Sequence, residues 1–455
     1  MKKKDRFFRM IRIIAGLLLI LAMGTSGYAD LSKMPQVLSI RERAVVINNI
    51  TDMRLERLLP GIMRETGFDM WIILCNEDDY DPVFNSMKPY DTWCPIVQIL
   101  VLYDRGPDKG VERLNVSRSD MRGLFEDAWD HRAWDNEKKE SQWDALARIV
   151  KERDPQKIAI NQAENIWAAD SLSVTLKDKL VRTIGPKYSA RLSSAEKTAT
   201  LWFETLLDEE LELYEGVVSL ARRILAETLS NRMITPGVTT LDDLKYSHLQ
   251  LISDLGIKTF AWPWFRIRWR DPEILEKYGM DDLTIRHGDL IQLDAGISYL
   301  RYYTDHSEWG YVLRPGETDI PEGFKQVMSE GNRLQDIFCG EFKEGLTGNE
   351  ILANILRTAR ERGVPEPKIY SHALGYFLHE PGPLIGLPWE QKDTGGRGEV
   401  RLVPNSTFTA ELSVNAPVPG YDGKKLRLAL EQMVAFTQKG TYYMAGRQKK
   451  FYLIK

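Results

Sequence analysis

Cysteine is scarce in this chain. Cys75, Cys94 and Cys339 are the three cysteines among 455 residues, and their wide spacing excludes a disulfide framework. A single Cys75–Cys94 bridge stays open as an alternative, but buried free thiols are the simpler interpretation. A chain of this length has to be held together by hydrophobic cores, and two domains are the natural expectation.

Clustered basic residues are also missing after the first 29 residues. The chain has 61 Lys and Arg against 65 Asp and Glu, a formal net charge of −4, and no basic stripe beyond that opening stretch. This balance argues against nucleic acid as a partner, because such binding depends on clustered positive charge. Low-complexity tracts and internal repeats are absent as well. The 43% hydrophobic and 28% charged fractions are those of an ordinary globular protein.

Long apolar runs are absent after the first 29 residues. That opening stretch holds six Lys or Arg before residue 13, an apolar run over residues 13–23, and the small residues Gly27 and Ala29 before Asp30. The pattern predicts a secretory signal peptide over residues 1–29, since the apolar run is short for a membrane anchor. We therefore expect an exported protein, periplasmic or extracellular. Cleavage would leave no stable membrane span and a net charge of −9, from 55 basic and 64 acidic residues.

Residues 30–190 alternate between helical and strand patterns. Apolar residues at helical spacing predict helices over residues 45–66 and 143–152. Short apolar runs at residues 70–74, 96–102 and 157–160 predict buried strands. This alternation predicts an α/β layer domain, and nothing in it resembles a phosphate-binding loop or a nucleophile elbow.

A Gly185–Pro186 step breaks this pattern and places a domain boundary near residue 190. Beyond it, apolar periodicity predicts a long helix over residues 198–229 and a second helix over residues 241–255. Strand patterns begin at Asp289. Helices followed by antiparallel strands favour an α+β fold for residues 191–455.

Four carboxylates in the last third of the chain fall on patterns typical of half-buried strands. Asp294 shares a strand face with Gln292, and the return strand of the same hairpin contains Asp305, so both aspartates can face one side. Glu411 and Glu431 occupy the polar faces of two later alternating runs. Any one of these residues alone would be interpreted as a solvated strand residue. The set gains its meaning together with a histidine motif.

That motif reads Ser-His-Ala-Leu-Gly-Tyr-Phe-Leu-His-Glu-Pro over residues 371–381, with His372 and His379 seven residues apart. Four carboxylates and an imidazole cannot share a pocket without cations, because like charges so close cannot all ionise. The donor set of Asp294, Asp305, His372, Glu411 and Glu431 suits two divalent ions better than one.

The order and spacing of these residues resemble the pita-bread metallopeptidase family of methionine aminopeptidases, Xaa-Pro aminopeptidases, prolidases and metal-free creatinases. That family carries an Asp, a second Asp eleven residues on, a His-x-x-Gly segment with another His seven residues later, and two Glu. The resemblance covers residues 195–450. The preceding segment is similar to the N-terminal domain of the prolidase, aminopeptidase P and creatinase branch. The resemblance thus implies a creatinase-N-like α/β domain, residues 30–190, before a pita-bread catalytic domain, residues 191–455.

The resemblance also implies a role for each site residue. Asp294 would bind one metal ion, and Asp305 and Glu431 would bridge two ions. His372 and Glu411 would complete the ligands of the second ion. Glu411 would in addition move a proton during hydrolysis, while His379 would hydrogen-bond the substrate carbonyl. We favour Mn²⁺ as the metal, although Co²⁺ or Zn²⁺ suits the same donors.

The chain departs from the family pattern around the substrate pocket. Peptidase members carry a further His shortly before the first Asp, whereas this region has no His and offers Arg266, Arg268 or Arg270 in its place. His306 and Ser307 replace the usual Thr-Arg after the second Asp. These changes leave the metal ligands intact and make the substrate an open question.

Several other side chains have structural interpretations. Strand alternation turns His306 to the sheet face opposite Asp305, where it would be a packing residue. Three histidines lack acidic or His partners at useful spacing and are interpreted as structural: His131, His248 and His287. Three tryptophans form a cluster that suits a core or an interface, with a substrate-pocket wall as the alternative: Trp262, Trp264 and Trp269.

The expected function is hydrolysis of peptides from the N-terminus, removing one residue or cleaving a dipeptide, with Xaa-Pro peptides as the leading substrate class. Two alternatives stay open. One is a creatinase-like hydrolase of small C–N substrates, and the other is a binding protein whose enzyme site has decayed. Both are disfavoured because all five metal ligands are kept. A homodimer would be consistent with the family.

Overall fold

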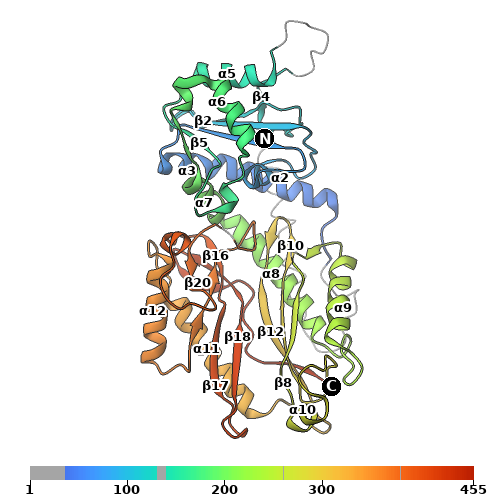
Figure 1. Cartoon of the computed structure of the whole chain (residues 1–455). Coiled ribbons are helices and arrows are strands. Elements are labelled where there is room, and N and C mark those ends of the chain that lie inside the picture. Colours follow the sequence, from blue (N-terminus) through green and yellow to red (C-terminus); the bar gives the residue numbers. More distant parts are fainter. Residues whose placement is uncertain (1–35, 131–139, 260, 380) are drawn as a thin grey trace. The chain divides into compact units, whose positions relative to one another are not determined.

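The computed structural model describes residues 36–130, 140–259, 261–379 and 381–455 (Figure 1). The predicted signal peptide over residues 1–29 and His131 lie outside the described residues. The chain forms two compact units, one of Leu38–Leu207 and one that contains Asp208–Lys455. Among the described helices, none is long and apolar enough to cross a lipid bilayer.

The first unit is built on one mixed sheet with strand order β4-β3-β2-β1-β5-β6. Its central strand β1 (Met70–Asn76) pairs antiparallel with β2 (Val97–Asp104) and parallel with β5 (Ile158–Ile160). The outer strands are β3 (Val111–Asn115), β4 (Glu126–Asp127) and β6 (Leu192–Ser194). The three strands predicted from apolar runs are therefore confirmed, and they form the middle of the sheet.

Helices cover both sides of this sheet (Figure 1). On one side, α5 (Gln142–Arg153) and α6 (Val174–Ser189) bury Leu146, Ile149 and Leu180 against the β1 residues Met70 and Ile72. On the other side lie α2 (Ile40–Arg57) and α3 (Leu59–Thr66). These two helices replace the single predicted helix over residues 45–66, because Pro60 begins a new helix rather than continuing the first.

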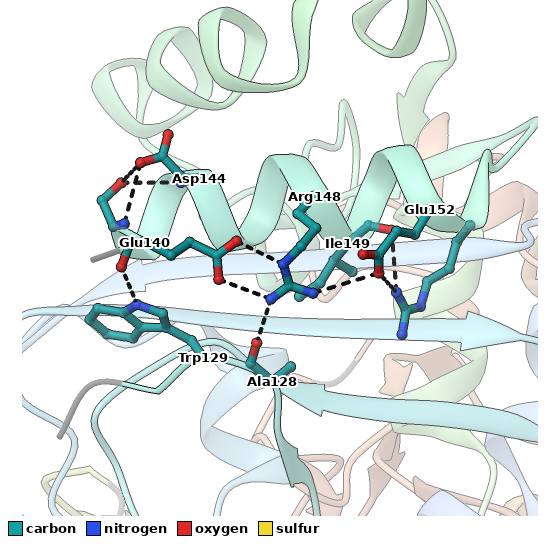
Figure 2. Close-up of polar contacts among 9 residues, drawn as sticks. Ala128, Trp129, Glu140, Asp144, Arg148, Ile149 and Glu152 are labelled. Carbon is teal, nitrogen blue, oxygen red and sulfur yellow. Dashed lines mark hydrogen bonds and ion pairs between the residues drawn. The ribbon is translucent and has the colours of Figure 1, made fainter. Parts of the chain in front are cut away.

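The start of α5 is fixed by polar contacts from two directions (Figure 2). The Arg148 guanidinium donates two hydrogen bonds to the Glu140 carboxylate, at 2.7 and 3.0 Å, and a third to the Ala128 carbonyl at 3.1 Å. The Trp129 indole N–H donates to the Glu140 carbonyl at 2.9 Å. The side chain of Asp144 accepts from the capping residue of the same helix. These contacts hold the chain at residues 128–129 to the residues that open the predicted helix.

The cysteines are free, as the sparse spacing indicated. Cys75 lies buried in β1, Cys94 is buried, and Cys339 in the second unit is half-buried. Burial raises the pKa of the Cys75 thiol. The thiols therefore act as small apolar side chains in the packing.

The division between the units falls after Leu207, beyond the boundary predicted near residue 190. The intervening helix α7 (Glu196–Glu204) packs within the first unit. Its Trp202 donates to Ser86 Oγ at 2.8 Å, and the Arg54 guanidinium lies 4.4 Å from the Trp202 ring centroid. The predicted single helix over residues 198–229 is therefore wrong. It is divided at residues 205–207 into α7 and α8 (Asp208–Thr228), because the two parts bury their apolar faces in different cores.

The second unit contains several sheets, and helices pack against them. Strands β8 (Trp264–Trp269), β9 (Leu290–Ala295), β12 (His306–Val312) and β21 (Tyr452–Ile454) form a sheet of order β21-β12-β9-β8. The pair β12–β21 is parallel, and the other strand pairs described in this unit are antiparallel. Two further sheets contain β17 (Leu412–Pro417) with β18 (Lys425–Leu430), and β16 (Ser406–Thr409) with β19 (Met433–Thr437). Antiparallel strands and packed helices confirm the α+β prediction for this part of the chain.

Two hydrophobic cores support these sheets. Helices α8 and α9 (Leu241–Asp254) bury Leu225 and Leu244 against β9 and β12. Helices α11 (Glu322–Gly340) and α12 (Gly348–Glu361) bury apolar residues against β17 and β18. At Gly331 of α11, an added Cβ would lie 2.8 Å from Leu430 Cδ1, so the missing side chain allows the helix to approach β18.

Candidate metal centre

Asp294 and Asp305 lie on one face of the β9–β12 hairpin. The antiparallel register pairs Asp294 with Ser307, and Asp305 lies two residues before Ser307. Since every second residue of a strand points to the same face, Asp305 is a diagonal neighbour of Asp294 on that face. Asp305 is buried and precedes the first residue of β12, whereas Asp294 is half-buried within β9. Alternation along the sequence predicted this shared face correctly.

Glu411 and Glu431 lie at junctions between strands rather than within them. The prediction that both sit inside alternating strands is wrong, because Glu411 connects β16 to β17 and Glu431 connects β18 to β19. The two junctions face each other. The pairs Thr409↔Met433 and Leu412↔Leu430 share one continuous register, which places Glu411 directly opposite Glu431. An isolated bridge from Glu431 to Ser307 connects this pair to the aspartate hairpin.

His372 is buried at the end of β14 (Ser371–His372) with one ring nitrogen directed at the carboxylates. Its Nδ1 lies 3.1 Å from the Ala373 carbonyl, so Nδ1–H is the donor and Nε2 keeps its lone pair. Nε2 lies 4.0 Å from Asp305 Oδ2. Burial, followed by the charge of His379, lowers the pKa of His372 to about 3. The imidazole is therefore neutral at physiological pH, as a metal ligand must be.

The carboxylates repel one another strongly. Burial, followed by the charge of Asp294, raises the pKa of Asp305 well above its usual range. Burial and the charges of neighbouring acids do the same for the pKa values of Glu411 and Glu431. Burial raises the pKa of Asp294 to about 6. Such a set is stable in its ionised form only when cations balance it.

Three ligand atoms from this set lie close enough to hold one ion. Asp305, His372 and Glu431 each offer an atom within 4.8 Å of the others. Within the described part of the chain, Asp305 Oδ1, Glu431 Oε1 and His372 Nε2 are buried without a hydrogen-bond partner. Asp294 and Glu411 lie outside this trio, but their charges act on Glu431. The orphaned atoms and the oxygen-rich donors fit divalent metal ions.

His379 has a different environment from His372. Its side chain is exposed, and the two imidazole rings meet edge to face with centroids 4.6 Å apart. Partial desolvation, followed by the charge of Arg397, lowers the pKa of His379. An exposed imidazole beside the candidate metal ligands can reach a substrate that approaches from solvent.

His248, His287 and His306 have structural environments. His248 is buried against Thr228 Oγ1 at 2.7 Å, and His287 Nδ1 lies 2.6 Å from the Leu313 carbonyl. His306 is fully buried and pairs with Ala295 in the register, on the face of β12 opposite Asp305 as predicted.

The predicted tryptophan cluster is divided between two environments. Trp269 packs in the core with its ring centroid 5.3 Å from that of Phe324, whereas Trp262 and Trp264 are exposed. Only Trp264 reaches the metal centre, since its partner in the strand register is Asp294.

Three arginines were offered as replacements for the missing upstream His. Arg270 cannot take that role, because its guanidinium is already bound by other groups of the protein. Its guanidinium is buried in an ion pair with Asp289, at 2.9 and 3.0 Å. Arg266 and Arg268 lie near Asp294 instead, and their charges lower the pKa of that carboxyl against the larger effect of burial.

Two residues near the metal centre were not selected from the sequence. Tyr370, whose ring centroid lies 5.4 Å from that of His372, has a raised pKa because of burial and the charges of Glu411 and Glu431. Arg427 lies on the same strand face as Ala429 and near Glu411. The alternation that places Glu431 on this face was the sequence signal that could have selected Arg427.

Known proteins share both the sequence pattern and the fold. The sequence model of metallopeptidase family M24 matches residues 212–438. The probable dipeptidase PepE of Mycobacterium bovis is 24% identical over 164 residues, which cover 36% of this chain and 39% of that protein. The chain therefore spans well under half the length of this curated relative.

Solved structures of similar fold cover most of the chain. The X-Pro aminopeptidase from Thermotoga maritima superposes with a TM-score of 0.59 at 18% identity, covering 86% of this chain and 99% of that one. The N-terminal domain of the FACT complex subunit SPT16 from Cicer arietinum has a TM-score of 0.56 at 12% identity, covering 90% and 99%. These likenesses show the pita-bread fold, and with the match over residues 212–438 they establish that the chain belongs to metallopeptidase family M24.

Proposed function

We propose that this metallopeptidase uses two divalent metal ions, Mn²⁺ by preference, to cleave residues from the N-terminus of peptides, with Xaa-Pro peptides as the leading substrate class. The observation that carries the proposal is the buried, mutually repelling set of carboxylates around a neutral imidazole. Glu411 and Glu431 face each other across the strand junctions, and His372 Nε2 is directed at Asp305. A site built only for stability would not gather four such acids.

The donor set divides naturally between two ions. Asp305 and Glu431 each have two oxygens and lie closest to His372, so they are suited to bridge. Asp294 on β9 would complete one end, and His372 with Glu411 the other. Bound ions of this kind polarise a carbonyl group and make a bound water acidic near neutral pH.

The protein side chains supply the remaining chemistry. The raised pKa of Glu411 suits a group that takes a proton from the attacking water and returns it to the leaving nitrogen. His379, exposed beside His372, can donate a hydrogen bond to the oxygen of the scissile carbonyl as charge develops there.

The substrate class and location draw on other observations. The X-Pro aminopeptidase and the probable dipeptidase named above act, by their names, on short peptides or peptide N-termini. The basic and apolar start of the chain supports export to the periplasm or the cell exterior. A homodimer is the proposed assembly.

A peptide-library digest with metal analysis tests this function. The full chain, loaded with Mn²⁺, is expected to hold about two ions and to shorten peptides from the N-terminus, with Xaa-Pro termini cleaved fastest. The exposed Glu361 of α12 provides a matched control, since Glu361→Gln should leave both readouts unchanged. A chain that holds two ions and cleaves no peptide would overturn the peptidase proposal. A chain that cleaves with one ion would overturn the dinuclear one.

A further inference from the structure

Strand β8 carries two arginines beside the metal centre. The antiparallel register pairs Trp264 with Asp294 and Arg266 with Gln292. Residues directly opposite each other share a sheet face, so Trp264 and Arg266 lie on the face that carries Asp294. A bulge between Ile267 and Trp269 places Arg268 out of the regular alternation. Its Nε donates to Gln292 Oε1 at 2.5 Å, on the same face.

A third arginine reaches the same place from a distant part of the sequence. Arg427 lies on β18 opposite Asn415, with its Nε 3.4 Å from Ser413 Oγ. Its charge acts on Glu411 and also on Arg268. Arg266, Arg268 and Arg427, which we call the arginine patch, therefore gather next to the metal-binding carboxylates.

The positive charge of this patch is not balanced by the protein. Within the residues that the structure describes, none of the three guanidinium groups forms an ion pair with a carboxylate. Burial, followed by the charges of Arg266 and Arg427, lowers the pKa of Arg268. The nearby Arg270 shows the contrast, since Asp289 neutralises it fully. Against the larger effect of burial, the patch lowers the pKa values of Asp294 and Glu411, whose charges the metal ions would use.

The patch also has an aromatic side. The Arg266 guanidinium lies 4.4 Å from the ring centroid of Trp264, whose side chain is 59% exposed. A guanidinium over an aromatic ring keeps its N–H edge available to an acceptor. Arginines in such an arrangement bind carboxylates through paired hydrogen bonds.

We propose that Arg266, Arg268 and Arg427 bind a carboxylate of the substrate beside the metal centre. The inference rests on the proposed peptidase function and specifies its substrate. The carboxylate can be the C-terminus of a short peptide or the side chain of an Asp or Glu near the scissile bond. Either source would bring to the patch the negative charge that the protein does not provide.

The test compares matched peptides that differ by one charge. One arm uses a dipeptide with a free C-terminal carboxylate against its C-terminal amide. The other uses amidated peptides with Glu against Gln in the residue after the scissile bond. For the Mn²⁺-loaded chain, kcat/KM for the charged member of at least one pair should be higher by about tenfold, the ratio that corresponds to about 1.4 kcal/mol. The pair that shows the preference identifies the source of the carboxylate.

Variants connect that preference to the patch. Arg268→Gln should lower the ratio of kcat/KM for the charged peptide to kcat/KM for the neutral peptide about tenfold, with the loss appearing in KM for the charged peptide. Arg268→Lys should restore part of the preference, while Arg357→Gln, an exposed arginine of α12, serves as the matched control. Equal losses for charged and neutral peptides in the patch variants would overturn the inference, as would an absence of charge preference in the unmodified chain.

A binding measurement separates this inference from the proposed function. Titration calorimetry with the same peptide pairs does not require turnover. Tighter binding of the charged member, lost in Arg268→Gln, would support the carboxylate site even if no peptide were cleaved. Equal binding of both members together with normal cleavage would overturn the site and leave the peptidase function standing.

Discussion

Glu411 lies directly opposite Glu431, at the point where the β16–β19 pair gives way to the β17–β18 pair. Two carboxylates in this position cannot both ionise without a cation, because burial and the charge of the other acids raise the pKa of each. In the metal-free protein, protons must therefore be held where the metal-loaded protein would hold ions. This replacement of protons by metal ions has measurable consequences.

Removing Asp305, one of the two carboxylates proposed to bridge the ions, should eliminate the site. We expect Asp305→Ala to lose metal binding and to lower kcat by more than about a thousandfold, because one side chain would hold both ions. Metal content by mass spectrometry and peptide hydrolysis check the result, with Glu361→Ala as the control. Full activity in Asp305→Ala would exclude the dinuclear arrangement.

The two histidines of the motif should separate by their effects. His379→Ala should keep its metal and lower kcat about a hundredfold, as expected for losing one hydrogen bond to a developing oxyanion. His372→Ala should lose metal, because Nε2 is the ring atom directed at Asp305. Metal content and kcat measured on the same preparations distinguish the roles. Metal loss in His379→Ala alone would reverse the assignment.

The metal-free protein should show the cost of its buried acids in the pH dependence of unfolding. The pKa of Asp294 is about 6 in the folded chain, above the value of about 4 in an unfolded chain. The folded state thus binds more protons in this window, and its stability falls as pH rises from about 4 through 6. Because Asn cannot ionise, metal-free Asp294→Asn should gain stability relative to the unmodified chain over the same window.

This gain is measured as the difference in melting temperature between variant and unmodified chain, in chelator, at pH 4.5 and at pH 7.5. Taking the difference removes the opposing effect of His372 and His306, whose lowered pKa values favour folding as pH rises. The exposed Asp281 supplies the control substitution Asp281→Asn. A difference that does not change with pH would contradict the raised pKa of Asp294.

Metal should stabilise the second unit in proportion to its binding. At a free Mn²⁺ concentration about one hundred times Kd, linkage predicts about 2.7 kcal/mol of stabilisation for each ion bound. Calorimetric melting with chelator and with increasing Mn²⁺ checks the effect, and Asp305→Ala should abolish it. Equal stabilisation of Asp305→Ala would place the bound metal elsewhere.

The sequence predicted best what local periodicity controls. Alternation along residues 288–296 and along the return strand correctly placed Asp294 and Asp305 on one face, and it turned His306 to the other. The helix over residues 198–229 failed, since its apolar periodicity continues through Leu206 and Leu207 although the two halves belong to different cores. Apolar periodicity predicts that a helix face is buried, but it does not indicate which core buries that face.

Relations between distant segments were beyond such patterns. The run that carries Glu411 alternates smoothly, so nothing local marks the junction where the chain passes from one sheet to the next. The arginine patch depends on Arg268 and Arg427, which are far apart in sequence and meet only through the strand pairing. The family spacing selected five residues that the fold brings near one another, and their role as ligands stays a prediction. The side chains around them could be identified only from the fold.

The bridge between Ser307 and Glu431 makes the geometry of the candidate metal centre depend on how two sheets are aligned. Its two backbone hydrogen bonds, at 3.0 and 3.3 Å, join the sheet of β12 to the junction that follows β18. Asp305 and Glu431 lie at or beside this bridge, so a slip of one sheet against the other would separate them. A chain with correct composition but misaligned sheets would not load metal. Metal binding would then depend on correct alignment of the two sheets, so only a correctly folded chain would become active.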